Sequence, residues 1–266
     1  MLTLTAGDAR VEIDPDRGGR LTHVAVGDLE LLLTPDDDPG GTHWGSFPMA
    51  PWAGRTREAR FTFAGVDHAL PVNSGHHAIH GTVRDRAWIV EEADRTHARL
   101  SCSFGPAWPF EGWAEQQIAV HDDHLEQRLS VHSADGAMPA SCGWHPWFRR
   151  RLARGGPARL SLDARSMYER DDDFIATREL VTPPPPGPWD DCFTRLGKPT
   201  RLVWPKAATL TIETDCPDLV VYTVPEEAIC IEPQTAPPDA LNVDPFVVEP
   251  DRPLVATTGW RWKVTG

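Results

Sequence analysis

Apolar and polar residues alternate with a period of two in several segments along the chain. In the segment 97–104 the even-numbered positions are apolar and the odd-numbered positions are polar. This alternation is typical of a β-strand that buries one face and exposes the other. The segments 124–133 and 207–214 repeat the pattern. The segment 219–224 is apolar with little alternation, which is typical of a strand covered on both faces.

Signals for helix are weak throughout the chain. No segment has an apolar stripe at helical spacing over three turns, and the best helical candidate, 166–180, contains three consecutive aspartates at 171–173. The 26 prolines and 21 glycines interrupt the chain with turns too often for long helices. The sequence therefore predicts an all-β fold of antiparallel strands with little helix.

The chain has 266 residues, which is enough for one large β domain. The segments 36–41 and 183–188 are predicted loops, and the four prolines that open the second loop favour an extended conformation. This loop could be a linker between domains, but strands of the same character lie on both sides of it. We therefore predict a single domain over 1–266.

Charge and cysteine usage narrow the class of protein. The chain carries 26 Lys and Arg against 39 Asp and Glu, a formal net charge of -13, so polyanions are repelled and nucleic acid is not an expected partner. The five cysteines form no CxxC pair and are odd in number, which predicts free thiols in a reducing compartment. The sequence shows no signal peptide and no run of 18 apolar residues, so we expect a cytoplasmic protein without a membrane partner.

Four segments place ionisable and aromatic side chains where a plain β-sandwich has no need of them. They are 47–55, 76–84, 143–148 and 229–235, the last preceded by the acidic segment 189–193. Glu232 follows an apolar triplet at the end of a predicted core strand, where a carboxylate is costly unless it is paired or functional. His145 is flanked by bulky residues. Taken alone, it could be a buried histidine bonded to a backbone carbonyl.

Metal and sugar are the two ligand classes that these segments suggest. His76, His77 and His80 are potential metal ligands, but no His-x-His pair occurs and no later His and Glu complete a cupin-like site, so no metal is expected. The 11 tryptophans favour a sugar, because aromatic rings stack on the apolar faces of pyranoses. Most of them are expected in the core. Trp52 and Trp147 lie inside the polar segments and are candidates for a sugar pocket.

Taken in order, the polar segments resemble the motifs of the aldose 1-epimerases, or galactose mutarotase-like proteins. PWAGR at 51–55 is similar to a family segment that ends in Asn-Arg, AIHGTVR at 78–84 to its LHGG region, GWHPWF at 143–148 to HPYF, DDCF at 190–193 to DHxF, and IEPQTAPPDALN at 231–242 to a strand-end Glu with a PDAxN tail. Each motif alone is weakly specific. Five of them in this order, over nearly the whole chain, are a specific resemblance.

The resemblance implies a large twisted antiparallel β-sandwich with the site in its concave face. It implies an isomerase that interconverts the α and β anomers of a hexose and needs no metal or other cofactor. By position it makes His145 the general acid, protonated at neutral pH, and Glu232 the general base, ionised. It places Arg55, His80 and Asp190 on the sugar hydroxyls.

Departures from the family pattern bear on the preferred sugar. Gly54 stands where the family has Asn, and Thr82 stands where it has the second Gly of HGG. Arg84 and Arg86 follow the pocket histidine, and because arginine suits phosphate and sulfonate, the substrate could be an anionic sugar, a hexose 6-phosphate or a sulfonated hexose. The alternative interpretation, that the two arginines are surface charges in a turn, is the favoured one.

A second alternative is a non-catalytic carbohydrate-binding protein that keeps the pocket without turnover. Binding alone requires no acid and base, so the presence of both His145 and Glu232 favours the enzyme. The hexose, the metabolic pathway and the oligomeric state are not determined by the sequence.

Overall fold

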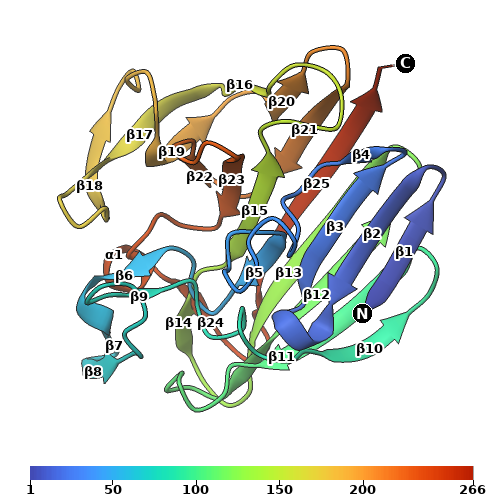
Figure 1. Cartoon of the computed structure of the whole chain (residues 1–266). Helices are drawn as coiled ribbons and strands as arrows, with labels where there is room; N and C mark the ends of the chain where they lie inside the picture. The colour runs from blue at the N-terminus through green and yellow to red at the C-terminus, as the bar shows by residue number, and fades with distance from the viewer. Residues whose placement is uncertain (266) are drawn as a thin grey trace.

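Two large antiparallel sheets form the body of the protein, which a computed structural model describes over residues 1–265. The eleven-stranded sheet contains, in spatial order, β1 (Leu2–Ala6), β2 (Ala9–Asp14), β3 (Arg20–Val26), β5 (Ser46–Met49), β15 (Gly143–Arg149), β23 (Ala228–Gln234), β22 (Asp218–Tyr222), β19 (Asp190–Leu196), β17 (Ala164–Arg170) and β18 (Ala176–Val181), with β4 (Leu29–Glu30) on β3. In Figure 1 this sheet runs from β1 on the right to β18 on the left.

The second sheet has eight strands. In spatial order they are β10 (Ile89–Ala93), β11 (His97–Ser103), β12 (Gly112–Val120), β13 (His124–Ser133), β25 (Leu254–Val264), β21 (Ala208–Thr214), β20 (Thr200–Trp204) and β16 (Arg159–Ser161). Three small pairs complete the strands: β6 (Arg55–Thr56) with β9 (Ala78–Ile79), β7 (Arg60–Phe63) with β8 (Val66–Ala69), and β14 (Met138–Ala140) with β24 (Phe246–Val248).

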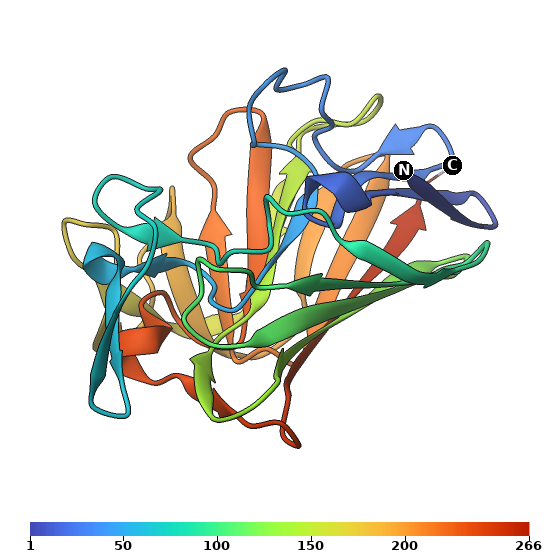
Figure 2. The same ribbon diagram turned by 90° about the horizontal axis from the view of Figure 1, so that it is seen from below.

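Helix is a minor component, as the sequence predicts. Within residues 1–265 it consists of α1 (Ala240–Val243) and two short 3-10 turns, η1 (Pro15–Arg17) and η2 (Arg57–Ala59). Figure 2 shows α1 beside the β7–β8 hairpin at one end of the molecule. The prediction of an all-β, antiparallel fold is confirmed.

The hydrophobic core lies between the two large sheets and follows from the period-two pattern. Phe148 of β15 packs against Trp260 of β25 across the interface, with ring centroids 4.8 Å apart. The alternating segments at 97–103, 124–133 and 208–214 are strands that contribute one face to this core. Burial of these apolar side chains is the main stabilising contribution to the sandwich.

The segment 166–180 is two strands rather than a helix. β17 and β18 are joined by a turn in which one Asp171 side-chain oxygen accepts hydrogen bonds from the backbone N–H groups of Asp173 (3.0 Å) and Ile175 (3.2 Å). Aspartate favours turns because its short side chain bonds nearby backbone groups. The run of aspartates that weakens the helical pattern is therefore the hairpin turn itself.

Alternation also creates the polar face of the larger sheet. In β15, Trp144 and Phe148 point into the core, so His145 and Trp147 point to the opposite face. In β23, Ile231 points into the core and Glu232 points away from it. Neighbouring strands thus bring separate sequence motifs to one surface.

All five cysteines are buried and free. Among residues 1–265 no helix combines the length and the apolar character needed to cross a membrane.

Asp218, at the start of β22, is a costly buried carboxylate. It is 3% exposed, and burial raises its pKa from 3.8 to about 6. A carboxyl whose pKa is raised by folding contributes stability that is fully present below its pKa in the unfolded protein. This stability is lost as pH rises through its pKa in the folded protein. We expect Asp218→Asn to raise the free energy of unfolding at pH 8 by up to about 3 kcal/mol, since one pKa unit is about 1.4 kcal/mol.

Urea unfolding at two pH values tests this expectation for Asp218. The gain in the free energy of unfolding should be large at pH 8. It should shrink as pH falls below the ordinary carboxyl pKa of 3.8, where the wild-type side chain is protonated in both the folded and the unfolded protein. Asp135→Asn, at an exposed turn, is the matched control and should change little at either pH. An equal gain at both pH values would show that ionisation of Asp218 is not the cause.

Candidate active site

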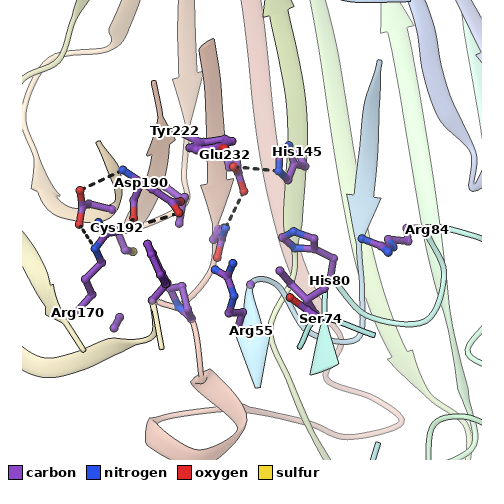
Figure 3. A pocket seen from close by; sticks show the side chains of 18 of the residues that line it. Arg55, Ser74, His80, Arg84, His145, Arg170, Asp190, Cys192, Tyr222 and Glu232 are labelled. Atoms are coloured by element: carbon purple, nitrogen blue, oxygen red, sulfur yellow. Dashed lines mark hydrogen bonds and ion pairs between the residues drawn. The ribbon is translucent and has the colours of Figure 1, made fainter. Parts of the chain in front are cut away.

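A cavity of about 300 Å³ opens on the polar face of the larger sheet, at the low end of the size range of small-molecule sites. All five residues predicted to form the site line it: Arg55, His80, His145, Asp190 and Glu232. Figure 3 shows His145 and Glu232 paired, with Arg55 and His80 below them and Asp190 on the side away from His145. The structure therefore brings together residues that are up to 177 positions apart, between 55 and 232.

Arg55 and His80 are positioned by the small β6–β9 pair, in which Arg55 is opposite Ile79. The His80 backbone N–H donates to the carbonyl of Gly54 at 3.0 Å. Gly54 has φ +68°, and a Cβ there would lie 3.0 Å from Pro238. Glycine in place of the family's Asn is therefore what this backbone conformation favours.

The neighbouring HGT segment also depends on glycine. Gly81 has φ +72°, and a Cβ there would lie 2.0 Å from the carbonyl oxygen of Ala50. Thr82 does not have a positive φ, and its N–H donates to the same carbonyl at 2.9 Å. Only the first of the two family glycines is therefore required by the backbone here.

His145 is held by aromatic stacking. Its ring lies between Phe47 and Trp147, with both centroid distances 5.0 Å and interplanar angles of 26° and 13°. Its Nδ1 atom is buried and has no hydrogen-bond partner among the residues described. Stacking on both faces and the Glu232 contact at Nε2 therefore fix the orientation of this imidazole.

Glu232 has a partner for each carboxyl oxygen. Oε1 lies 3.2 Å from Nε2 of His145, and Oε2 accepts a hydrogen bond from Nε2 of Gln234 at 3.3 Å. Glu232 and Gln234 are two positions apart on β23, so their side chains share one face. His145 and Glu232 thus form a buried pair in the cavity.

Burial shifts the acid–base chemistry of this pair away from the sequence-based expectation. It lowers the pKa of His145 to about 3, with further lowering by the positive charges of Arg20 and Arg84. It raises the pKa of Glu232 well above its ordinary value, helped by the negative charge of Asp190. The free pocket thus favours neutral imidazole beside a protonated carboxyl, not imidazolium beside carboxylate.

Asp190 belongs to a second polar group on the opposite side of the cavity. Arg170 donates to the Asp190 backbone carbonyl at 2.7 Å, and its Nε lies 3.2 Å from a carboxylate oxygen of Asp191. Burial raises the pKa of Asp190, and the charges of Arg55 and Arg170 oppose that rise. Both hydrogen-bond donors and acceptors therefore face the space next to His145 and Glu232.

Two sequence candidates lie outside the cavity. Trp52 is buried in the core, where it stacks on Trp108 with centroids 5.7 Å apart, so the expectation that it lines the pocket was wrong. Arg86 lies against Cys102, and its guanidinium approaches Gly105. Arg84, by contrast, lines the cavity with its side chain only 18% exposed. Although the two arginines are only two positions apart, the turn directs Arg84 into the cavity and Arg86 away from it.

Several cavity residues were not among the candidates from the sequence. Gln234 could have been found, because it stands two positions after Glu232 in a strand. Tyr222 is the last residue of β22, and no sequence motif marked it as a site residue. Phe47 and Phe174 reach the cavity through tertiary packing.

Two groups of side chains that could hold a metal lie near the cavity. His76 and His77 both face Asp173 at 3.8 Å, but Nδ1 of His77 accepts a hydrogen bond from the Glu58 N–H at 3.0 Å. The neutral His77 ring therefore carries its proton on Nε2, which leaves no lone pair toward Asp173. His80 is not part of this group and lines the cavity instead.

The second group combines the reactive pair with Cys230. Burial raises the pKa of the Cys230 thiol well above its ordinary value, which disfavours the thiolate that metals bind. The positive charges near His145 and Glu232 also oppose a bound cation. The geometry suits proton transfer better than metal binding.

Comparison with known proteins agrees with this fold. The family model described as aldose 1-epimerase matches residues 1–264. A search of curated proteins gave no significant match. Solved structures match over nearly their full lengths at low sequence identity.

Three of these structures illustrate the similarity. A galactose mutarotase-like protein from Clostridium acetobutylicum has a TM-score of 0.89 at 17% identity, covering 99% of this chain and 95% of its own. An aldose epimerase homologue from C. elegans has a TM-score of 0.87 at 16% identity, and the match covers 100% of this chain and 99% of the homologue. A galactose 1-epimerase from Lactobacillus acidophilus has a TM-score of 0.82 at 18% identity, and the match covers 99% of this chain and 94% of that protein.

The sandwich with a polar cavity on one face is thus the galactose mutarotase-like fold. The chain belongs to the aldose 1-epimerase family.

Proposed function

We propose that the protein is an aldose 1-epimerase that interconverts the α and β anomers of a hexose. The observation that carries the proposal is the 3.2 Å separation of His145 Nε2 and Glu232 Oε1 inside the cavity. Anomer exchange needs a base for the C1 hydroxyl and an acid for the ring oxygen. Because these two oxygens are bonded to the same carbon, the acid and the base must lie side by side, as these residues do.

Ring opening moves two protons. The Glu232 carboxylate takes the proton of the C1 hydroxyl, the imidazolium of His145 gives a proton to the ring oxygen, and the bond between C1 and the ring oxygen breaks as the C1 carbonyl forms. Rotation about the C1–C2 bond presents the other face of the aldehyde. Ring closure with both transfers reversed gives the other anomer.

The shifted pKa values of His145 and Glu232 are compatible with this cycle, because they favour the protonation state that the pair has after ring opening. After ring opening the pair consists of neutral His145 and protonated Glu232, which is the state that burial favours in the free pocket. The pair holds one proton before and after the step, only on a different partner. At 3.2 Å, direct transfer between Nε2 and Oε1 can restore the starting tautomer.

Binding of the sugar is assigned to Arg55, His80 and Asp190. Burial and the neighbouring positive charges lower the pKa of His80 well below its ordinary value, so its ring is neutral and can both donate and accept. Its Nδ1 is buried without a partner among the residues described, and so is Oε1 of Gln234. Buried polar atoms are normally hydrogen-bonded, and sugar hydroxyls would satisfy both.

The test is anomer equilibration measured by polarimetry and NMR on a panel of neutral and phosphorylated hexoses. Freshly dissolved single anomers should equilibrate faster with the protein than in a heat-denatured control, after subtraction of spontaneous mutarotation. Binding without acceleration for every sugar would instead establish the non-catalytic carbohydrate-binding protein.

An anionic sugar is the second candidate substrate, and the position of Arg84 favours it. Arg84 lines the cavity, and within residues 1–265 its one ion pair is with the exposed Asp85 at 2.9 Å. The buried Arg20 adds positive charge nearby, since it also lowers the pKa of His145. A phosphate or sulfonate group would gain charge-assisted hydrogen bonds from Arg84.

Arg84→Ala separates the two substrate classes. If an anionic sugar is the substrate, KM for a hexose 6-phosphate should rise by more than tenfold, because a hydrogen bond to a charged group contributes about 1.5 to 3 kcal/mol. KM for the neutral hexose should change little. Arg86→Ala, two positions away and outside the cavity, is the matched control in the same assay. Equal small effects of Arg84→Ala on both sugars would contradict the anionic substrate.

A further inference from the structure

Phe174 combines two unfavourable features at the edge of the cavity. It lies in the β17–β18 turn, the residue is 48% exposed, and it lines the cavity. Its φ of +60° is in the left-handed region, which a bulky side chain rarely adopts. An exposed aromatic ring on a strained backbone is a reason to look for a function there.

The contacts of the ring place it beside the groups assigned to sugar binding. The guanidinium carbon of Arg170 lies 4.5 Å from the Phe174 ring centroid, and that of Arg55 lies 5.9 Å away. Arg170 in turn holds Asp190 and Asp191. The aromatic contacts of His145 are with other rings, Phe47, His80 and Trp147. Phe174 therefore faces the hydroxyl-binding side of the cavity.

The turn that carries Phe174 is tied to the opposite wall. Arg57 forms ion pairs with Asp171 and with Asp173, the latter at 3.3 Å. Arg57 follows the short strand β6 that contains Arg55, and its backbone N–H donates to Asp239 at 2.9 Å. These ties fix the position of the Phe174 ring relative to Arg55.

We propose that Phe174 is a specificity-determining residue whose ring forms a platform for the apolar face of a pyranose, with Arg57 as its positioning residue. The proposal rests on the proposed function insofar as the cavity must bind a sugar. Pyranoses present a face of C–H groups that stacks on aromatic rings, while open-chain polyols present none of fixed shape. The platform therefore selects cyclic hexoses and acts on binding, because the proton transfers occur at His145 and Glu232.

Substitution of Phe174 tests the platform through the split between KM and kcat. Phe174→Ala should raise KM by about 5- to 30-fold, the loss expected for one partly buried aromatic contact, and leave kcat within about twofold. Phe174→Tyr keeps the ring and should retain the wild-type KM within about twofold. Arg57→Ala should raise KM in the same direction by a smaller factor. Trp113→Ala removes a similarly exposed ring that lies outside the cavity, on β12, and should leave KM unchanged.

The same variants distinguish failure of the platform from failure of the proposed function. Sugar affinity is measured separately by isothermal titration with a hexose, so the comparison does not require turnover. Weaker binding by Phe174→Ala supports the platform even if the wild type has no epimerase activity. Wild-type turnover with unchanged KM and affinity in Phe174→Ala would overturn the platform and leave the epimerase intact. Unchanged KM in Arg57→Ala would overturn the positioning role.

Discussion

Glu232→Gln is expected to lower kcat by about 10² or more, the contribution of one positioned acid–base group. The amide keeps the shape of the carboxyl and can still contact Gln234, but it can neither take the C1 hydroxyl proton nor hold the proton of the pair. Sugar affinity should change much less, since it is assigned to Arg55, His80 and Asp190. The measurement is kcat and KM by polarimetry with spontaneous mutarotation subtracted.

The control for this substitution is Glu226→Gln, at an exposed position shortly before the same strand. It should retain the wild-type kcat. Full activity of Glu232→Gln would show that the base is misassigned. A large rise in KM at unchanged kcat would show instead that Glu232 binds the sugar without transferring its proton.

His145→Asn should lower kcat by a similar factor of about 10² or more, because it removes the group that protonates the ring oxygen. The double variant with Glu232→Gln should be little worse than either single variant. Residues that act as one unit show such non-additivity. Multiplication of the two losses would mean that His145 and Glu232 act independently. His132→Asn, on β13 and outside the cavity, is the control.

The pH dependence of kcat/KM follows from the one proton that the pair shares. The active pair is lost when it gains a second proton, at His145, whose pKa burial lowers to about 3, and when it loses its only proton, at Glu232, whose pKa burial raises. The acidic limb should therefore belong to His145 and the basic limb to Glu232, the reverse of the assignment that unperturbed groups would give. The observed values belong to the pair as a whole.

A decline in kcat/KM as pH falls through 6.5, the ordinary value for histidine, would contradict this account. It would indicate that the pocket does not suppress protonation of His145. A plateau that continues well below that pH would support the neutral pair.

The fold could be predicted from the sequence because period-two alternation is a local property. Strands such as 97–103 and 124–133 show which residues face the core without any knowledge of their partners. The same alternation puts Glu232 and Gln234 on one face of β23. The motifs that resemble the aldose 1-epimerases also lie in short stretches of sequence. The single domain over 1–266 and the catalytic roles stay predictions.

Tertiary packing decided which of the candidate side chains reach the cavity. Trp52 and Trp147 occupy similar polar segments, yet only Trp147 reaches the cavity, because the direction of a side chain depends on the strand and layer that it joins. Arg84 and Arg86 differ for the same reason. Phe174 is brought to the cavity by a hairpin turn and long-range ion pairs, which a local pattern does not contain.

The protonation of the reactive pair shows the physical limit of the sequence most clearly. The residue types His145 and Glu232, with their ordinary pKa values, suggest imidazolium and carboxylate at neutral pH. Burial penalises the charged form of each, and the charges that add to the shifts come from segments distant in sequence. The sequence by itself determined which groups could exchange protons. The folded structure determined which protonation state burial favours, because the pair is desolvated only once the folded chain surrounds it.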